Sequence, residues 1–313
     1  MRMRRNVANS GRSHSGSAIF AVALTCALLV GCGSGGGGPS GTSGGGRQLT
    51  IANVGSDTML QLGMAWSEAY RQVEPSVSVE VTGGGSGVGI AGLINGSVDL
   101  ANSSRAFEEQ EIADLKAKQN KEPKEFLIGY DALSIYVHKD NPLSEISLEQ
   151  LGEIYGKDGR IRKWSDLGVS NIPGAKGDEI IVVSRQNNSG THHYFKEAVI
   201  GKKNDQRLDT VNQNGSKDVV DLVGKTPNAI GYSGMGYKTD AVKVLKVSKK
   251  KGEPAVAPSI ATTLDKSYPI SRPMFMYTAG EPPPHVRKYI DWIVSDAGEA
   301  IVKEQGYVPL PRK

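Results

Sequence analysis

The sequence predicts an α/β protein, and three observations support that class. Runs rich in β-branched residues, such as 77–82, alternate along the chain with amphipathic stretches of helical period, such as 58–73. Clusters of Gly, Ser, Asn and Pro separate the two kinds of segment. The 313 residues are 38% hydrophobic and 22% charged, which is typical of a globular protein.

The alternation starts after residue 47 and restarts once, near residue 147. The first series consists of a strand at 49–56, a helix at 58–73 that ends near Pro75, a strand at 77–82, a helix at 88–97, a strand at 98–104, a surface helix at 108–120 and a strand at 132–140. The second consists of helix 147–157, strand 179–186, helix 190–201, helix 216–226, strand 229–237, strand 272–279 and a helical region at 283–306.

The N-terminus has the pattern of a secretory signal. A basic segment with four arginines precedes the apolar run 18–30, which is too short to span a membrane comfortably. The run ends in Leu-Val-Gly-Cys32, which resembles a bacterial lipobox. We therefore expect 1–31 to be a signal peptide and Cys32 to be the lipidated mature N-terminus. A cleaved signal with a chance cysteine is the alternative.

Residues 32–47 are expected to form the lipidated cysteine and a flexible Gly/Ser tether. Four of the 37 basic residues precede Cys32 and none of the 33 acidic residues does, so the chain after Cys32 carries 33 of each. This balance gives no indication of a nucleic-acid partner. Cys26 leaves with the signal, so no disulfide, cysteine zinc site or cysteine nucleophile is expected in the mature domain.

A glycine-rich segment follows the strand at 77–82, and Gly87 to Gly92 spell G-x-G-x-x-G. In a dinucleotide-binding unit, the acidic residue that holds the ribose lies about 20 residues further on. Asp99 comes only 12 residues after Gly87, so this interpretation is weakly supported. There is also no G-x-x-x-x-G-K-[ST] for a nucleoside triphosphate.

Three strand-to-helix junctions place Ser or Thr at a predicted helix start: "NVGSDTM", "TGGGSGVGI" and "SRQNNSGTHH". Each alone could be an ordinary helix cap. Together they predict convergence on one anion, because helix N-termini present free N–H groups and hydroxyls add donors. Arg185 lies four residues before Ser189 and could grip a tetrahedral oxyanion with two N–H groups.

From these residues on, the chain resembles the phosphate-binding lipoproteins of bacterial phosphate ABC transporters. The resemblance covers nearly everything after the tether, and it rests on "GSDTM", "GGGSGVGI", "VDLANSSR", "LGEIYGKDGRIRKWSDL", "SRQNNSGTHHYF", "AIGYSGMGY" and "YPISRPMFMY". It implies a type II periplasmic-binding-protein fold with two α/β lobes joined by two crossover strands. Lobe 1 would be 48–133 plus 255–313 and lobe 2 would be 134–254.

The resemblance also implies a function: an extracytoplasmic, lipid-anchored protein that binds inorganic phosphate and delivers it to membrane permease subunits, with no catalysis and no cofactor or metal. The expected phosphate ligands are Asp57, Thr58, Ser86, Gly87, Ser104, Arg105, Arg185, Ser189, Gly190 and Thr191. Ser86 would donate its hydroxyl and N–H, Gly87 its N–H, and Arg185 would be the charged clamp.

One position departs from many relatives, which place an aspartate where this chain has Ser104. In those relatives the aspartate accepts a hydrogen bond from the protonated oxygen of phosphate, a group that sulfate lacks. We hypothesise that Asp57 supplies the acceptor and that Arg105 supplies or balances charge nearby. A helix cap is the alternative for Asp57, and a surface salt bridge for Arg105.

Two other functions stay open from the sequence. The first is a binding protein for sulfate, molybdate or another oxyanion. The second is a phosphate-ester hydrolase, which is disfavoured because no base is evident and because His192 and His193 have no metal-ligand partners at a suitable spacing.

Overall fold

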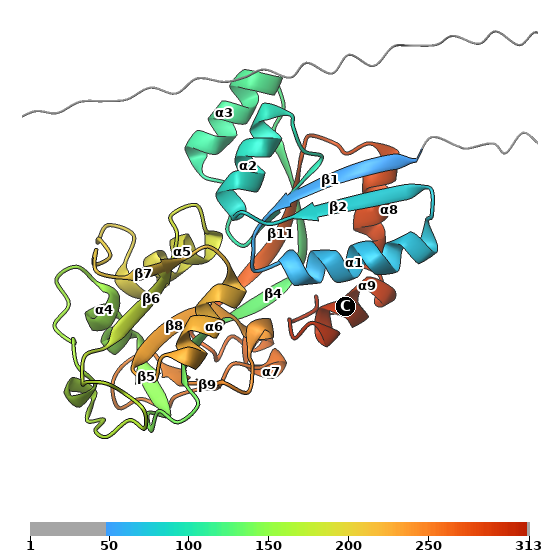
Figure 1. Cartoon of the computed structure of the whole chain (residues 1–313). Coiled ribbons are helices and arrows are strands. Elements are labelled where there is room, and N and C mark those ends of the chain that lie inside the picture. The colour runs from blue at the N-terminus through green and yellow to red at the C-terminus, as the bar shows by residue number, and fades with distance from the viewer. Residues whose placement is uncertain (1–47, 312–313) are drawn as a thin grey trace, which may run out of the picture. The chain divides into compact units, whose positions relative to one another are not determined.

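The structure is a computed structural model that describes residues 48–311, and over these residues it is an α/β unit (Figure 1). Its main sheet has nine strands, in the order β2-β1-β3-β11-β4-β8-β6-β7, with β9 paired to β4; a second sheet pairs β10 with β5. The strands are β1 (Leu49–Gly55), β2 (Val77–Thr82), β3 (Leu100–Ser103), β4 (Pro123–His138), β5 (Glu145–Ser147), β6 (Ile181–Arg185), β7 (Val211–Gln213), β8 (Ala229–Gly234), β9 (Val242–Val244), β10 (Lys246–Ser248) and β11 (Ser271–Ala279).

The α-helices connect these strands. They are α1 (Leu60–Val73), α2 (Ser86–Asn95), α3 (Glu109–Gln119), α4 (Leu148–Tyr155), α5 (Gly190–Phe195), α6 (Ser216–Lys225), α7 (Ile260–Leu264), α8 (Pro284–Ile293) and α9 (Asp296–Glu304). Two 3₁₀ turns, η1 (Trp164–Leu167) and η3 (Met235–Tyr237), and one π-helical turn, η2 (Lys196–Ile200), complete the order.

The long strand β4 links the two halves of the main sheet. Its residues 123–132 pair antiparallel with β11, and its residues 133–137 pair antiparallel with β8. On one side β2, β1 and β3 run parallel, and on the other β8, β6 and β7 run parallel. The loops that follow parallel strands meet at one edge of a sheet, which is where ligands bind in open α/β folds.

Apolar side chains of α1 cover the β1 part of the sheet, as Figure 1 shows for the helix and strand. Leu62 and Trp66 are fully buried and belong to the same apolar cluster as Ile51 of β1. The Trp66 indole also donates to the carbonyl oxygen of Gly298 in α9 (2.9 Å). This packing fixes the start of α1, and with it the turn 56–59, relative to the strands.

The G-x-G-x-x-G motif lies inside α2 rather than in a loop. A Cβ on Gly89 would lie 2.4 Å from the carbonyl oxygen of Val54, so this glycine lets the helix pack closely on β1. The loop before α2 is formed by Gly83, Gly84 and Gly85, and the last two have φ of +114° and +97°. Helix–strand packing therefore accounts for the motif without a dinucleotide.

The predicted α/β class and the major elements are confirmed, with local differences. Strand β4 begins at Pro123 rather than at 132, the predicted helix 190–201 becomes π-helical after Phe195, and the predicted region 283–306 is two helices interrupted near Ser295. Five short strands and turns had no clear signal in the sequence: β5, β7, β9, β10 and η1.

The lobe boundaries stay a prediction. One apolar cluster lies entirely between Ala132 and Ile270, but another joins Ile51 of β1 with Val183 of β6 and Val219 of α6. The described residues do not include the predicted signal peptide, Cys32 or the tether. Within residues 48–311, no helix has both the length and the apolar character needed to cross a membrane.

Candidate functional site

Six hydroxyl side chains converge where strands and helices meet, and we call them the hydroxyl cluster. Each is at most 3% exposed; they are Ser56, Thr58, Ser86, Ser104, Thr191 and Ser216. They follow β1 and β3, or lie in the first turns of α2, α5 and α6. The parallel strands carry these loops to one edge of the sheet, so residues far apart in sequence become neighbours.

Hydrogen bonds connect the cluster across the chain. Thr58 Oγ1 lies 2.8 Å from Thr191 Oγ1 and 3.4 Å from Ser216 Oγ. Ser104 Oγ accepts from Ser56 Oγ at 3.1 Å and lies 3.4 Å from Ser86 Oγ. Buried hydroxyls at this density offer several rotatable O–H donors to an acceptor-rich ligand.

Arg185, at the end of β6, is the main cation of the site and is 1% exposed. Its Nη1 donates to Ser216 Oγ (2.9 Å), and its Nη2 donates to Asp57 Oδ2 (3.0 Å) and to the carbonyl oxygen of Asn214 (2.7 Å). Its Nε is buried and finds no hydrogen-bond partner within residues 48–311. Burial lowers the pKa of the guanidinium, and Asp57 opposes this only in part, so an added anion would stabilise the buried charge.

Asp57 lies where two loops meet, and its side chain does not cap α1, whose N-cap residue is Met59. Its Oδ2 accepts from Arg185, and its Oδ1 accepts the N–H of Gly84 (2.9 Å). Two buried tyrosines hold the turn: Tyr237 donates to the carbonyl oxygen of Asp57, and Tyr307 to that of Thr58, both at 2.5 Å. The helix-cap alternative for Asp57 therefore does not apply.

The other expected loop residues are close to the cluster, with some donors already engaged. Ser189 caps α5, because its Oγ accepts from the N–H groups of Thr191 and His192 (3.2 and 3.4 Å). The Gly87 N–H donates to the carbonyl oxygen of Asn188 at 3.0 Å, and Asn188 Nδ2 donates to that of Gly84. A direct role of the Gly87 N–H in ligand binding stays a prediction and would require this bond to open.

Arg105 lies outside the hydroxyl cluster in an ion pair. Its two Nη atoms donate to the two carboxylate oxygens of Glu111 at 2.7 and 2.6 Å. Nη1 also lies 4.0 Å from Glu108 Oε1. This geometry favours the salt-bridge alternative for Arg105, and charge balance near the anion site stays a prediction.

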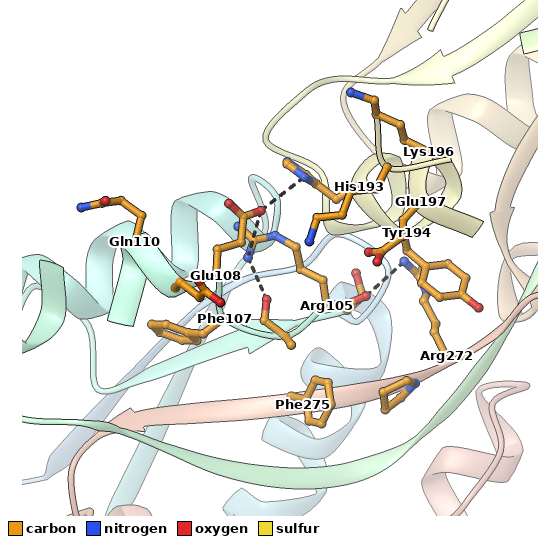
Figure 2. Close-up of a pocket in the computed structure, with 15 residues that line it drawn as sticks. Arg105, Phe107, Glu108, Gln110, His193, Tyr194, Lys196, Glu197, Arg272 and Phe275 are labelled. Atoms are coloured by element: carbon orange, nitrogen blue, oxygen red, sulfur yellow. Dashed lines mark hydrogen bonds and ion pairs between the residues drawn. The ribbon is translucent and has the colours of Figure 1, made fainter. Parts of the chain in front are cut away.

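A cavity of about 950 Å³ adjoins the cluster, and Ser104 and Arg272 are part of its lining (Figure 2). One side is formed by residues 104–110 and the other by side chains of α5 and η2, including His193 and Lys196. His193 Nδ1 approaches Glu108 Oε1 at 3.5 Å across it. The cavity thus reaches the hydroxyl cluster at Ser104, and it also reaches Arg272.

The comparisons with known proteins identify the family of this chain. A family model described as a PBP superfamily domain matches residues 40–297. The phosphate-binding protein PstS of Pseudomonas aeruginosa PAO1 is 33% identical over 273 residues, which are 84% of this chain and 84% of that protein. The chain belongs to the PBP superfamily and, within it, to the PstS family.

Other PstS relatives and solved structures give the same result. PstS of Staphylococcus aureus USA300 is 30% identical over 298 residues, 93% of this chain and 87% of that protein. A putative phosphate ABC transporter substrate-binding protein from Clostridium perfringens, solved with bound phosphate, has a TM-score of 0.74 and 29% identity over 84% of this chain and 100% of its own. An ABC-type phosphate transport receptor from Vibrio cholerae has a TM-score of 0.65 and 26% identity, and the match covers 83% of this chain and 100% of that one. The fold is the type II periplasmic-binding-protein fold predicted from the sequence.

The sequence reasoning missed a second buried arginine at the site, Arg272, and its partner Asp131. They are 1% and 0% exposed, and Arg272 Nη2 lies 2.9 Å from Asp131 Oδ2. A signal existed in both cases, because each charged residue lies at or next to the start of a strand predicted from the sequence (272–279 and 132–140), and a buried charge needs a partner. Ser56 and Ser216 were also missed: Ser56 lies at a predicted strand-to-helix junction, and Ser216 starts the predicted helix 216–226, before which the strand β7 had no clear signal.

His192 follows the cluster in α5 and gives a prediction about stability. Burial, helped by nearby His193, lowers its pKa from 6.5 to about 4. The unfolded chain therefore binds more protons than the folded protein in that pH window, and stability falls as the pH falls through it. We expect His192→Gln to raise the melting temperature relative to wild type more at about pH 4.5 than at about pH 7.5. Thermal unfolding at both pH values measures this, and an equal difference at both would contradict it.

Proposed function

We propose that this protein is an extracytoplasmic solute-binding protein that captures inorganic phosphate in a cleft between two lobes, 48–133 with 255–313 and 134–254. It delivers the phosphate to the membrane permease of an ABC transporter. Cys32 carries a lipid that anchors the protein, and residues 33–47 tether the domain. The protein carries out no chemistry on its ligand.

The observation that carries this proposal is the contact between the buried Arg185 side chain and the hydroxyl cluster. The Nε of Arg185 finds no partner in the described part of the chain, and its Nη1 lies 2.9 Å from Ser216 Oγ. Ser216 Oγ lies 3.4 Å from Thr58 Oγ1, which is hydrogen-bonded to Thr191. Such a set is rich in donors, and a tetrahedral oxyanion supplies the matching acceptors. PstS relatives and a neighbour solved with bound phosphate make phosphate the leading candidate.

The proposal is tested by calorimetric titration of the chain, stripped of bound anion, with phosphate and then with sulfate near neutral pH. Tight binding of phosphate with weak binding of sulfate supports it. Equal binding of sulfate keeps the fold and the site but removes the assignment to phosphate. Binding of neither, with turnover of a phosphomonoester in the same preparation, would replace it with the hydrolase.

Asp57 gives the sharpest prediction about selectivity. Hydrogen phosphate carries a proton and sulfate does not, so a carboxylate at the ligand accepts from the first and repels the second. We expect Asp57→Asn to narrow the preference for phosphate over sulfate by about tenfold or more, because the lost hydrogen bond involves a charged group. Competition titrations of both anions measure the ratio, and a ratio equal to that of wild type would show that Asp57 acts only as the partner of Arg185.

A further inference from the structure

Arg272 and Asp131 form a buried ion pair directly behind the hydroxyl cluster. They are register partners on β11 and β4, and Asp131 Oδ2 accepts from Nε (3.2 Å) and Nη2 (2.9 Å) of Arg272. Asp131 Oδ1 accepts the N–H of Met235 at 3.0 Å. The carboxylate is therefore fixed by both the arginine and the backbone, and it holds the guanidinium in one orientation.

The same guanidinium reaches two threonines of the cluster from different parts of the chain. Its Nη2 lies 3.1 Å from Thr58 Oγ1, in the turn after β1, and 3.0 Å from Thr191 Oγ1, in α5. Its Nη1 also approaches the carbonyl oxygen of Ser104 at 3.4 Å. The Cζ of Arg272 also lies over the Tyr194 ring, 5.7 Å from its centroid.

These contacts determine which way the hydroxyl protons can point. A hydroxyl oxygen has two lone pairs and one proton, and Arg272 can only donate. Thr58 and Thr191 also share a hydrogen bond with each other at 2.8 Å. One Nη2 proton is donated to Asp131 and the other is shared between the two threonines, so the threonine that accepts the Thr–Thr bond has both lone pairs occupied. Its own proton is then donated outward, to a ligand or, in the case of Thr58, to Ser216.

We propose that Arg272, held by Asp131, is a positioning residue of the anion site that presets the Thr58–Thr191 pair to donate one hydroxyl proton to the anion. The inference rests on the proposed function and deepens it. A ligand oxygen at these threonines is an unprotonated acceptor, so the proton-bearing oxygen of hydrogen phosphate lies elsewhere in the site. Because the hydroxyl groups already point toward the ligand, they do not have to rotate when the anion binds, and this increases the affinity.

A purely structural role would have a different signature. A buried ion pair is weak evidence for stability, since its desolvation cost offsets much of the attraction. If the pair only supported packing, its loss would change the melting temperature and would affect phosphate affinity independently of the threonine hydroxyls. If it acts through the hydroxyls, its effect on affinity should require them.

The experiment is a double-mutant cycle measured by calorimetric titration of the full chain with inorganic phosphate. The paired change Arg272→Gln with Asp131→Asn removes both charges together, so neither is left buried alone. It is made in wild type and in a Thr58→Val, Thr191→Val background, and the melting temperature of each variant is recorded. The matched control is Arg207→Gln with Asp209→Asn, which neutralises another ion pair. In that pair the arginine is 9% exposed and the aspartate is exposed.

We expect the paired change to weaken phosphate binding by about 10- to 100-fold in the wild-type background and by no more than about twofold when the threonine hydroxyls are absent. The control is expected to bind like wild type. Unchanged affinity in the wild-type background, or an equal loss in both backgrounds, would overturn the inference while the proposed function stands. A wild-type chain that binds no phosphate would overturn the proposed function and this inference with it.

Discussion

Replacing Arg185 with alanine is expected to weaken phosphate binding by about 100- to 1,000-fold. The guanidinium is 1% exposed and is the cation that contacts both Ser216 and Asp57. Its loss removes the charge that attracts the anion and leaves the Asp57 carboxylate uncompensated beside the ligand. Both effects disfavour the same bound state, so this is one of the two largest losses that we expect. Titration with phosphate measures it.

Two further variants make the Arg185 result interpretable. Arg185→Lys keeps a charge but loses the planar fork that reaches Ser216 and Asp57 together, so we expect binding between that of wild type and that of the alanine variant. Arg287→Ala removes an arginine that is half exposed and paired with Asp291, four residues further along the helix. We expect this control to leave phosphate affinity unchanged. Wild-type affinity in Arg185→Ala would remove this residue from the site.

Much of the site could be predicted because its residues lie at strand-to-helix junctions. Ser86, Arg185, Ser189 and Thr191 stand at such junctions in the sequence, and parallel strands bring the junctions to one edge of the sheet. The orientation of Asp57 could not be predicted in this way. It depends on Gly84 and Arg185, which reach it only after the glycine loop and the end of β6 have been placed.

The ion pair of Arg272 and Asp131 could not be predicted from local sequence patterns, because it depends on how two distant strands pair. The two residues are 141 positions apart and meet only because β11 pairs antiparallel with β4 in one register. That register depends on a strand that begins at Pro123, in a segment with no clear alternation in the sequence. Shifting the register by one residue would turn either side chain to the opposite face of the sheet.

The site combines two arginines with two aspartates, so these four groups carry no net charge. If the anion binds at this candidate site, its recognition depends less on net positive charge than on fixed donors in a buried environment, where each hydrogen bond is worth more than in water. The pairing also explains how two guanidiniums can be buried in one region. Each has its own carboxylate, Asp57 for Arg185 and Asp131 for Arg272.

The second large effect is expected from Gly190→Ala, the addition of a single methyl group. A Cβ on Gly190 would lie 2.3 Å from Ser86 Oγ, 2.7 Å from Ser104 Oγ and 2.9 Å from Ser86 Cβ. Rotating the Ser86 hydroxyl away would not relieve the contact with its Cβ. The start of α5 and the start of α2 must therefore separate, which spreads the hydroxyl cluster. We expect phosphate affinity to fall by about 10- to 100-fold, because an overpacking cost of about 1–3 kcal/mol falls mainly on the bound arrangement, in which the two helix starts must stay close.

The free protein should tolerate this methyl group better than the bound one, because α5 and α2 lie far apart in sequence and can separate without unfolding either helix. Gly190→Ala should therefore keep a melting temperature near that of wild type without ligand, but lose much of the rise that phosphate produces. Gly177→Ala is the matched control, since a Cβ there meets nothing within 4 Å. A full ligand-induced rise in Gly190→Ala would show that α5 and α2 do not approach closely in the bound state.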